Sequence, residues 1–185
     1  MKIRQGFVSN SSSTSFTFVF NGDSVDDLCK VLEDYKNYFE LSFENWDGRM
    51  CSCNFEDIKN SLKNVVLPQA PEDKDKYFDV AYPIPIQQEI DNLTEEALTE
   101  GVLTSDYVHD VYLYDLSSSE AAANLRKSLI MVNSAEKGLN RVIKVDFGDN
   151  HGHVCGGDVG IAMDYVGRNI EIIEDDLVVI TEQNR

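Results

Sequence analysis

The sequence has no long apolar run. No stretch approaches the roughly 18 apolar residues that a membrane-spanning helix requires, and the N-terminus lacks the apolar core of a signal peptide. The four cysteines show no paired small-domain spacing, so reduced thiols in a cytoplasm fit better than a disulfide framework. We therefore expect neither membrane insertion nor secretion. With 185 residues, 42% of them hydrophobic, the chain suits one domain with a real core.

Positive charge is also scarce. Lys and Arg number 16 against 33 Asp and Glu, which gives a formal net charge of −17. Such a chain repels phosphates at long range, so we expect no direct binding to nucleic acid. One interpretation of the acidity is solubility. The other is a face that binds a basic protein, or that mimics DNA and inhibits a nucleic-acid-binding protein of a host.

Recognisable catalytic signatures are missing as well. The sequence contains neither a Gly-x-Ser-x-Gly elbow nor a cysteine-protease signature. Adjacent acids occur at Asp26-Asp27, Glu95-Glu96 and Asp175-Asp176, and such pairs on a surface are typical of solvation rather than of acid–base catalysis. The sequence therefore favours a non-enzymatic protein.

What the chain does have is an unusual start, MKIRQGFVSNSSSTSF. It combines two cations and no acid with a hydrophobic step at Phe7 and Val8, and a run of Ser and Asn that begins at Ser9 and Asn10. The run leads directly into a hydrophobic strand, so we expect the segment to pack against the body of the protein. Tyr112 and Tyr114 are further candidates for an interface, because tyrosine tips are common in protein contacts.

The opening KIRQGFVSNSSSTSF resembles the start of a family of small tailed-bacteriophage and prophage proteins that have no assigned activity. The closing stretch, residues 165–185, resembles them less specifically. The resemblance implies a phage-type origin and carries over no catalytic residue. It implies a protein partner, with the chain acting as a capsid or tail accessory of the virion or as a factor that contacts a host protein. The implied location is the virion or the host cytoplasm, and an oligomer is possible.

Local patterns predict the elements of the first third. Residues 16–20 alternate as a strand, and Ser24 is a good N-cap for a helix that continues to about Phe39. Asn54 caps a second helix, and a turn or hairpin at residues 43–49 separates the two. In the second helix four apolar residues share a face: Phe55, Ile58, Leu62 and Val65.

The middle of the chain is punctuated by proline. Residues 68–76 form a polar connection, and residues 77–86 are extended, with Pro83 and Pro85 excluding a central strand. Residues 89–100 form a helix and residues 107–116 a strand. A capping-box pattern at Ser117 and Glu120 then opens a helix with four apolar residues on one face: Ala122, Leu125, Leu129 and Val132.

The last third has the character of an antiparallel meander, with expected strands at residues 141–147, 158–165, 170–173 and 177–180. The sum is an α+β fold, in which an N-terminal strand and helices precede a small C-terminal antiparallel sheet. We expect a single domain over residues 1–185, with possible subdivision near residues 68–76 and at about residue 140.

One loop, residues 146–158, combines glycine with carboxylates, histidine and cysteine. Zinc takes four N or S ligands, and His-x-His places two imidazoles on one side of an extended strand. The candidate zinc ligands are His151, His153 and Cys155, with Cys51 or Cys53 completing the set. These residues define the alternative functions of a metal-binding domain or a metal-dependent enzyme. The competing interpretation is a polar hairpin loop whose Gly and Asn residues relieve backbone strain.

Overall fold

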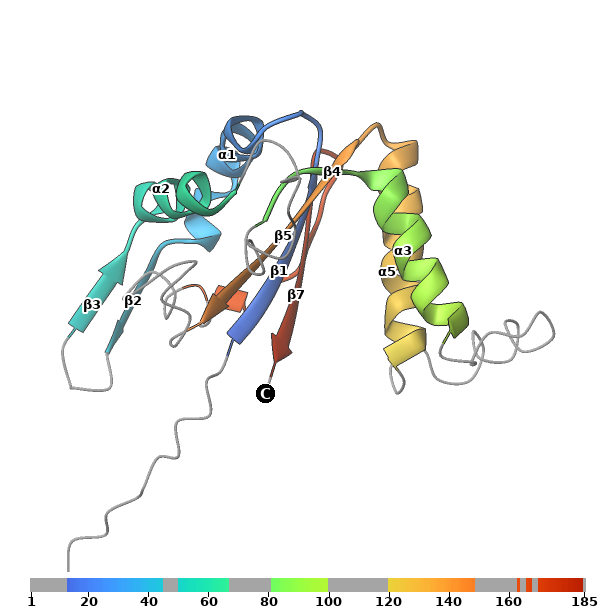
Figure 1. Ribbon diagram of the computed structural model, residues 1–185. Coiled ribbons are helices and arrows are strands. Elements are labelled where there is room, and N and C mark those ends of the chain that lie inside the picture. Colours follow the sequence, from blue (N-terminus) through green and yellow to red (C-terminus); the bar gives the residue numbers. More distant parts are fainter. Residues whose placement is uncertain are drawn as a thin grey trace, which may run out of the picture.

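A five-stranded antiparallel sheet lies at the centre of the protein, so the predicted α+β class is confirmed (Figure 1). The computed structural model describes residues 13–44, 50–66, 81–99, 120–148, 163, 166–167 and 170–184. The elements are β1 (Ser13–Phe20), α1 (Val25–Asp34), the 3₁₀ helix η1 (Lys36–Tyr38), β2 (Leu41–Glu44), β3 (Met50–Cys53), α2 (Phe55–Val65), β4 (Ile84–Pro85), α3 (Ile86–Thr99), α5 (Glu120–Glu136), β5 (Arg141–Gly148), β6 (Ile172–Ile173) and β7 (Leu177–Asn184).

The N-terminal strand β1 is the middle strand of the sheet, whose order is β4-β5-β1-β7-β6. β1 pairs along its whole length with β5 on one side and β7 on the other. The C-terminal strands therefore do not form a sheet of their own, because β5 and β7 each pair with β1. Both are buried on two faces where they begin, at Val142 and Ile143 and at residues 177–180, and the FTFVF sequence of β1 offers an equally apolar neighbour. β4 lies at an edge, as its proline requires.

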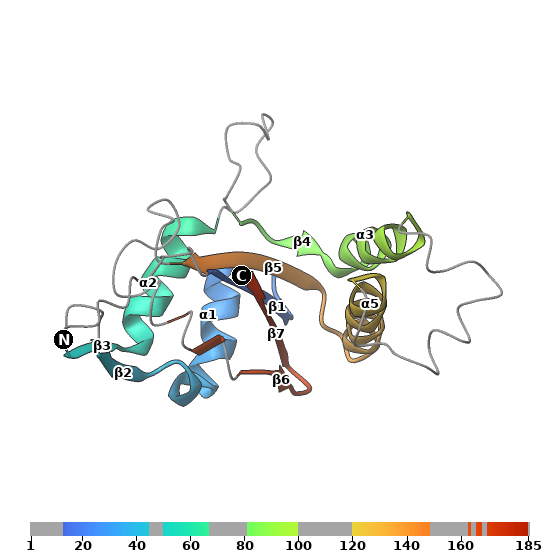
Figure 2. The same cartoon turned by 90° about the horizontal axis from the view of Figure 1, so that it is seen from below.

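Helices cover both faces of the sheet. Figures 1 and 2 show α1 and α2 on one side of the strands and the antiparallel pair α3 and α5 on the other. The hairpin of β2 and β3 belongs to the α1–α2 side and forms a separate two-stranded sheet. In the described part of the chain, no helix is both long and apolar enough to span a membrane.

The first face of the sheet, which α1 and α2 cover, is aromatic and aliphatic. Phe16 of β1 packs edge-on against Phe147 of β5, with ring centroids 5.3 Å apart. α2 buries the four apolar residues that the helical pattern predicted. Such burial contributes about 1.5–3 kcal/mol for each large side chain. The fully buried side chains on this side include Phe16, Phe18, Phe20, Leu28, Leu32, Phe39, Ile58, Leu62, Ile143 and Phe147.

The second face, which α3 and α5 cover, changes from apolar to polar along the strands. Its first row across the sheet is Val142–Val19–Val178, the next is Lys144–Thr17–Ile180, and the last is Asp146–Ser15–Glu182. The apolar end packs against the start of α3 and the later turns of α5. The apolar cluster on this side comprises Val19, Ile86, Ile90, Leu93, Met131, Leu139, Val142, Val178 and Ile180.

Both N-caps expected in the first third are confirmed. The Ser24 side chain accepts a hydrogen bond from the Asp27 amide, and Asn54 forms a reciprocal capping box with Asp57. The first helix is shorter than predicted and ends at Asp34. Tyr35 leaves the helical conformation, and the turn of η1 that follows brings Phe39 into the core.

Several expected elements lie wholly or mainly outside the described residues. These are the connection at residues 68–76, the strand at 107–116, the Ser117 cap and the strand at 158–165. Of the last, the structure describes Met163, which is helical, so the expected strand is wrong at that residue.

Candidate functional site

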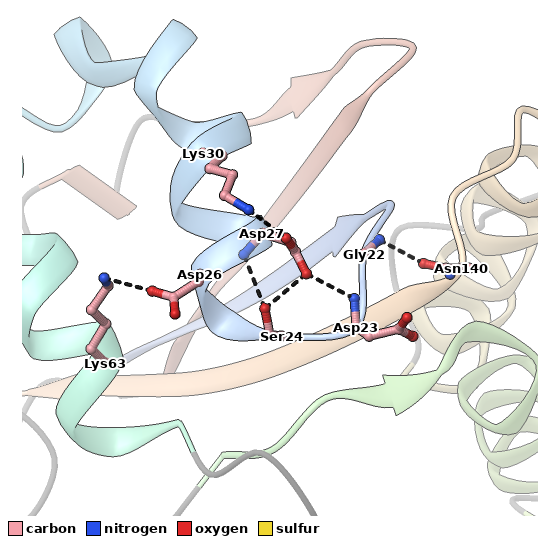
Figure 3. A network of polar contacts seen from close by, with 8 residues as sticks. All are labelled: Gly22, Asp23, Ser24, Asp26, Asp27, Lys30, Lys63 and Asn140. Carbon is pink, nitrogen blue, oxygen red and sulfur yellow. Dashed lines mark hydrogen bonds and ion pairs between the residues drawn. The ribbon is translucent and has the colours of Figure 1, made fainter.

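The turn between β1 and α1 holds a network of polar contacts (Figure 3). The Asp27 carboxylate accepts hydrogen bonds from Lys30 Nζ at 2.9 Å, Ser24 Oγ at 2.8 Å and the Asp23 amide at 3.2 Å. These donors, the Lys30 ammonium first among them, hold the pKa of Asp27 well below its usual range. Every hydrogen-bond donor to Asp27 lies within four residues of it in the sequence, so the network fixes the start of α1.

A second set of contacts ties this turn to the loop before β5. The Gly22 amide donates to Asn140 Oδ1 at 2.9 Å, and Arg141 contacts Asp23 at 2.6 Å. A Cβ on Gly22 would lie 2.4 Å from the Asp27 Cβ, which explains the glycine. Figure 3 shows the contact between Gly22 and Asn140, which joins two distant parts of the sequence. Their role is structural, because each polar group is used to join elements.

The two described thiols are buried on the first face of the sheet. Burial raises the pKa of Cys29 to about 11, so the thiol stays protonated at neutral pH and is a poor nucleophile. Cys53 is buried too, and its Sγ donates to the Asn54 carbonyl oxygen at 3.7 Å.

The structure leaves the zinc hypothesis as a prediction. His151, His153 and Cys155 lie outside the described residues, and of Cys51 the structure describes the backbone. Within the described ranges, no three His, Cys, Asp or Glu side chains gather as a metal site would require.

The predicted N-terminal interface, Phe7, Val8, Ser9 and Asn10, also lies outside the described residues, as do Tyr112 and Tyr114. These residues remain predictions.

The acids between β6 and β7 have structural partners. Asp175 pairs with Lys137 at 2.8 Å, which lowers the pKa of Asp175. Asp176 accepts a hydrogen bond from the Tyr35 hydroxyl at 2.7 Å, and this contact raises the pKa of Tyr35 to about 12. They hold the β6–β7 turn to α1 and α5, so they are poor candidates for a free acidic docking face.

A polar layer separates the α3–α5 pair from the polar end of the sheet. Glu89 of α3 is 1% exposed and lies within ion-pair distance of Lys144 on β5. Apart from this ion pair, its Oε1 has no hydrogen-bond partner within the described structure. Lys127 of α5 pairs with Glu182 of β7 in the same layer. The helices are therefore held here by charge and polar contacts, not by apolar packing.

The side of α5 that faces this polar layer is also polar. Asn124 is buried and donates to Glu96 of α3 at 3.2 Å. Ser128 is buried and shares a 3.2 Å hydrogen bond with Thr94 of α3. Met131, one turn later, meets the apolar row of the sheet and is fully buried. Along α5 the buried residues thus change from polar to apolar, as do the residues of the sheet that they contact.

The outer side of α5 carries the apolar residues instead. At about 100° of rotation per residue, Leu129 lies about 160° around the helix from buried Met131, and Val132 about 100° from it. Leu129 is 39% exposed and Val132 is 38% exposed, with half-buried Leu125 beside them. We call these three residues the α5 stripe. The predicted apolar face exists, but these three residues point away from the sheet. The fourth residue of that face, Ala122, lies on the same side of α5 and is buried.

Periodicity alone missed this orientation, because it assumes that the apolar side of a helix is the buried side. The signal that was available lies in the small polar residues Asn124, Ser128 and Ser134, which recur at helical spacing and are all buried. Comparison with known proteins found no matching family model, no matching curated protein and no matching solved structure.

Proposed function

We propose that this protein is a non-enzymatic binding module that acts through protein–protein contacts, and that the α5 stripe is its contact surface. The carrying observation is the inversion of α5, which buries Asn124 and Ser128 while Leu129 and Val132 face outward. An exposed row of large apolar side chains loses the free energy of burial unless another surface covers it. A partner protein supplies that cover.

The resemblance of the first sixteen residues to phage proteins supports a partner that is a phage structural protein or a host protein. On this proposal the chain works in the virion or in the host cytoplasm. Its high negative charge keeps it soluble while it displays an apolar row.

Comparative capture from phage-infected bacteria tests the proposal, with particles and soluble lysate analysed separately. The bait is the full chain, the Leu129→Gln/Val132→Gln variant or the Ile173→Gln variant. Ile173 is the matched control, because it is 51% exposed and lies on edge strand β6. We expect a protein that wild type and Ile173→Gln retain and that the double variant loses at least about tenfold. Equal retention by all three baits would show that the contact surface lies elsewhere.

A further inference from the structure

We infer that the partner presents a basic amphipathic helix to the α5 stripe. The inference rests on the proposed function and adds the chemistry of the partner. It draws on the geometry of the stripe and on the charges around it.

The shape of the stripe suits a helix. From Leu125 to Val132 it rises about 10 Å along α5, as a straight ridge of side chains at spacings of four and three residues. A helix packs on such a ridge through its own residues at i, i+3, i+4 and i+7. Its backbone hydrogen bonds are already made internally. An extended peptide would have to leave backbone groups unpaired, because the side of a helix offers no strand edge.

The charges around the stripe are acidic. Glu136 follows Val132 by four residues and is exposed on the same side of α5. On the neighbouring helix α3, Asp91 and Glu95 are exposed while Ile90 and Leu93 are buried. Asp91 and Glu95 each lie about 160° around α3 from buried Leu93, so they are on the side of α3 away from the sheet. Figure 2 shows α3 and α5 side by side, beyond the strands.

The cations of α5 are used on its other sides. Arg126 pairs with Glu171 at 2.7 Å, Lys127 pairs with Glu182, and Lys137 pairs with Asp175. Each of these pairs points toward β6, β7 or the turn between them. Of these cations, Arg126 is a neighbour of Leu129 on α5, and Glu171 neutralises it. Among the described residues, the surface that a partner meets is therefore an apolar ridge whose one neighbouring cation is paired and whose other charged neighbours, Glu136 and the α3 acids, are carboxylates. A helix with Lys or Arg on both sides of its apolar stripe is complementary to it in charge.

Two synthetic peptides of about 18 residues, or five helical turns, test this partner chemistry against the full chain. Both contain the same numbers of Leu and Lys. In one, the leucines recur at i, i+3, i+4 and i+7, and in the other Leu and Lys alternate as in a strand. Equal charge in the two peptides separates shape from simple attraction to an acidic protein. Fluorescence anisotropy with labelled peptide measures the affinity.

We expect the helical peptide to bind wild type at least tenfold more tightly than the alternating one. Leu129→Gln/Val132→Gln should weaken that binding at least tenfold, and Ile173→Gln should leave it unchanged. Asp91→Asn/Glu136→Gln should weaken it severalfold at low salt, and the difference should shrink at high salt because exposed charges are then screened.

Equal affinity for the two peptides, or unchanged affinity in the Leu129→Gln/Val132→Gln variant, would overturn the inference. So would self-association of wild type through the stripe, which would make a second copy its occupant. Binding that appears only after residues 101–118 are replaced by a Gly-Ser linker would identify the chain's own connection as the occupant and would likewise overturn the inference. If stripe-dependent capture succeeds and the peptides fail, the proposed function stands without this partner chemistry.

Discussion

The two faces of the central sheet are held in different ways. On the first face, three phenylalanines of β1 pack with aliphatic residues of α1, α2 and β5. On the second face, a short apolar cluster gives way to ion pairs and small polar residues beneath α3 and α5. Apolar burial dominates folding free energy, whereas polar contacts contribute little net. The comparison indicates that the first face contributes more of the free energy of unfolding than the second.

The largest difference between the faces should appear on removing core side chains. Phe18→Ala on the first face should lower the free energy of unfolding by about 3–5 kcal/mol, because it leaves a cavity in a fully buried cluster. Val19→Ala, the next residue of the same strand, faces α3 and α5 and should cost about 2 kcal/mol. Chemical denaturation measures both. Equal losses would mean that the two faces contribute equally to the free energy of unfolding.

The ion pair beneath α3 should respond asymmetrically to mutation. Lys144 is 52% exposed, whereas Glu89 is buried. Lys144→Met leaves a buried carboxylate without its cation and should cost about 3 kcal/mol. Glu89→Gln leaves a lysine that can turn to water, and should cost about 1 kcal/mol.

The double variant Glu89→Leu/Lys144→Met removes both charges and should be close to wild type in the free energy of unfolding, as replacements of buried pairs often are. Urea denaturation of the three variants provides the measurement. A double variant as unstable as Lys144→Met would show that the pair itself stabilises the second face.

The turn network of the first helix gives a smaller, pH-dependent effect. The pKa of folded Asp27 is depressed below its unfolded value of about 3.9, so its contribution is present above that value and is lost as the pH falls below it. Asp27→Asn should therefore lower the melting temperature at pH 6 and have less effect near pH 2. Thermal unfolding at the two pH values checks this. An equal drop at both would assign the effect to the cap geometry rather than to the charge.

The smallest effect on stability is expected on the outer side of α5. Leu129→Gln and Val132→Gln replace half-exposed side chains and should each change the free energy of unfolding by no more than about 0.5 kcal/mol. Met131→Ala, on the inner side of the same helix, should cost about 2–5 kcal/mol. Denaturation curves distinguish the cases. A large loss at Leu129 would mean that the stripe is part of the core.

Local signals predicted the parts of the fold that local chemistry determines. Ser24 and Asn54 cap their helices, and the face of α2 is the expected one, because these features depend on neighbours within a few residues. The central place of β1 was not predicted, since strand order depends on pairing between segments more than 100 residues apart. The side of α5 that is buried depends on the polar rows of the sheet beneath the helix. Those rows come from β1, β5 and β7, so the sequence of α5 does not contain them.

The α5 stripe was therefore predicted in part from the sequence. The sequence grouped Ala122, Leu125, Leu129 and Val132 on one side of a helix. In the structure Leu129 and Val132 face solvent, Leu125 is half-buried and Ala122 is buried. The candidates taken from short motifs, at residues 7–10, 51–53, 112–114 and 151–155, were chosen on residue type and local spacing, and they stay predictions. Spacing within a motif carries no information about which distant side chains complete it.

The middle position of β1 also has a consequence for synthesis of the chain. β1 leaves the ribosome first, yet its two neighbours, β5 and β7, begin at Arg141 and Leu177. At 5–20 residues per second, the second neighbour arrives on the order of ten seconds later. During that time the SFTFVF segment has two unpaired edges and a high tendency to form β-aggregates. The sheet is completed late in the synthesis of the chain. The yield of folded protein should therefore depend on chaperones that shield a nascent strand.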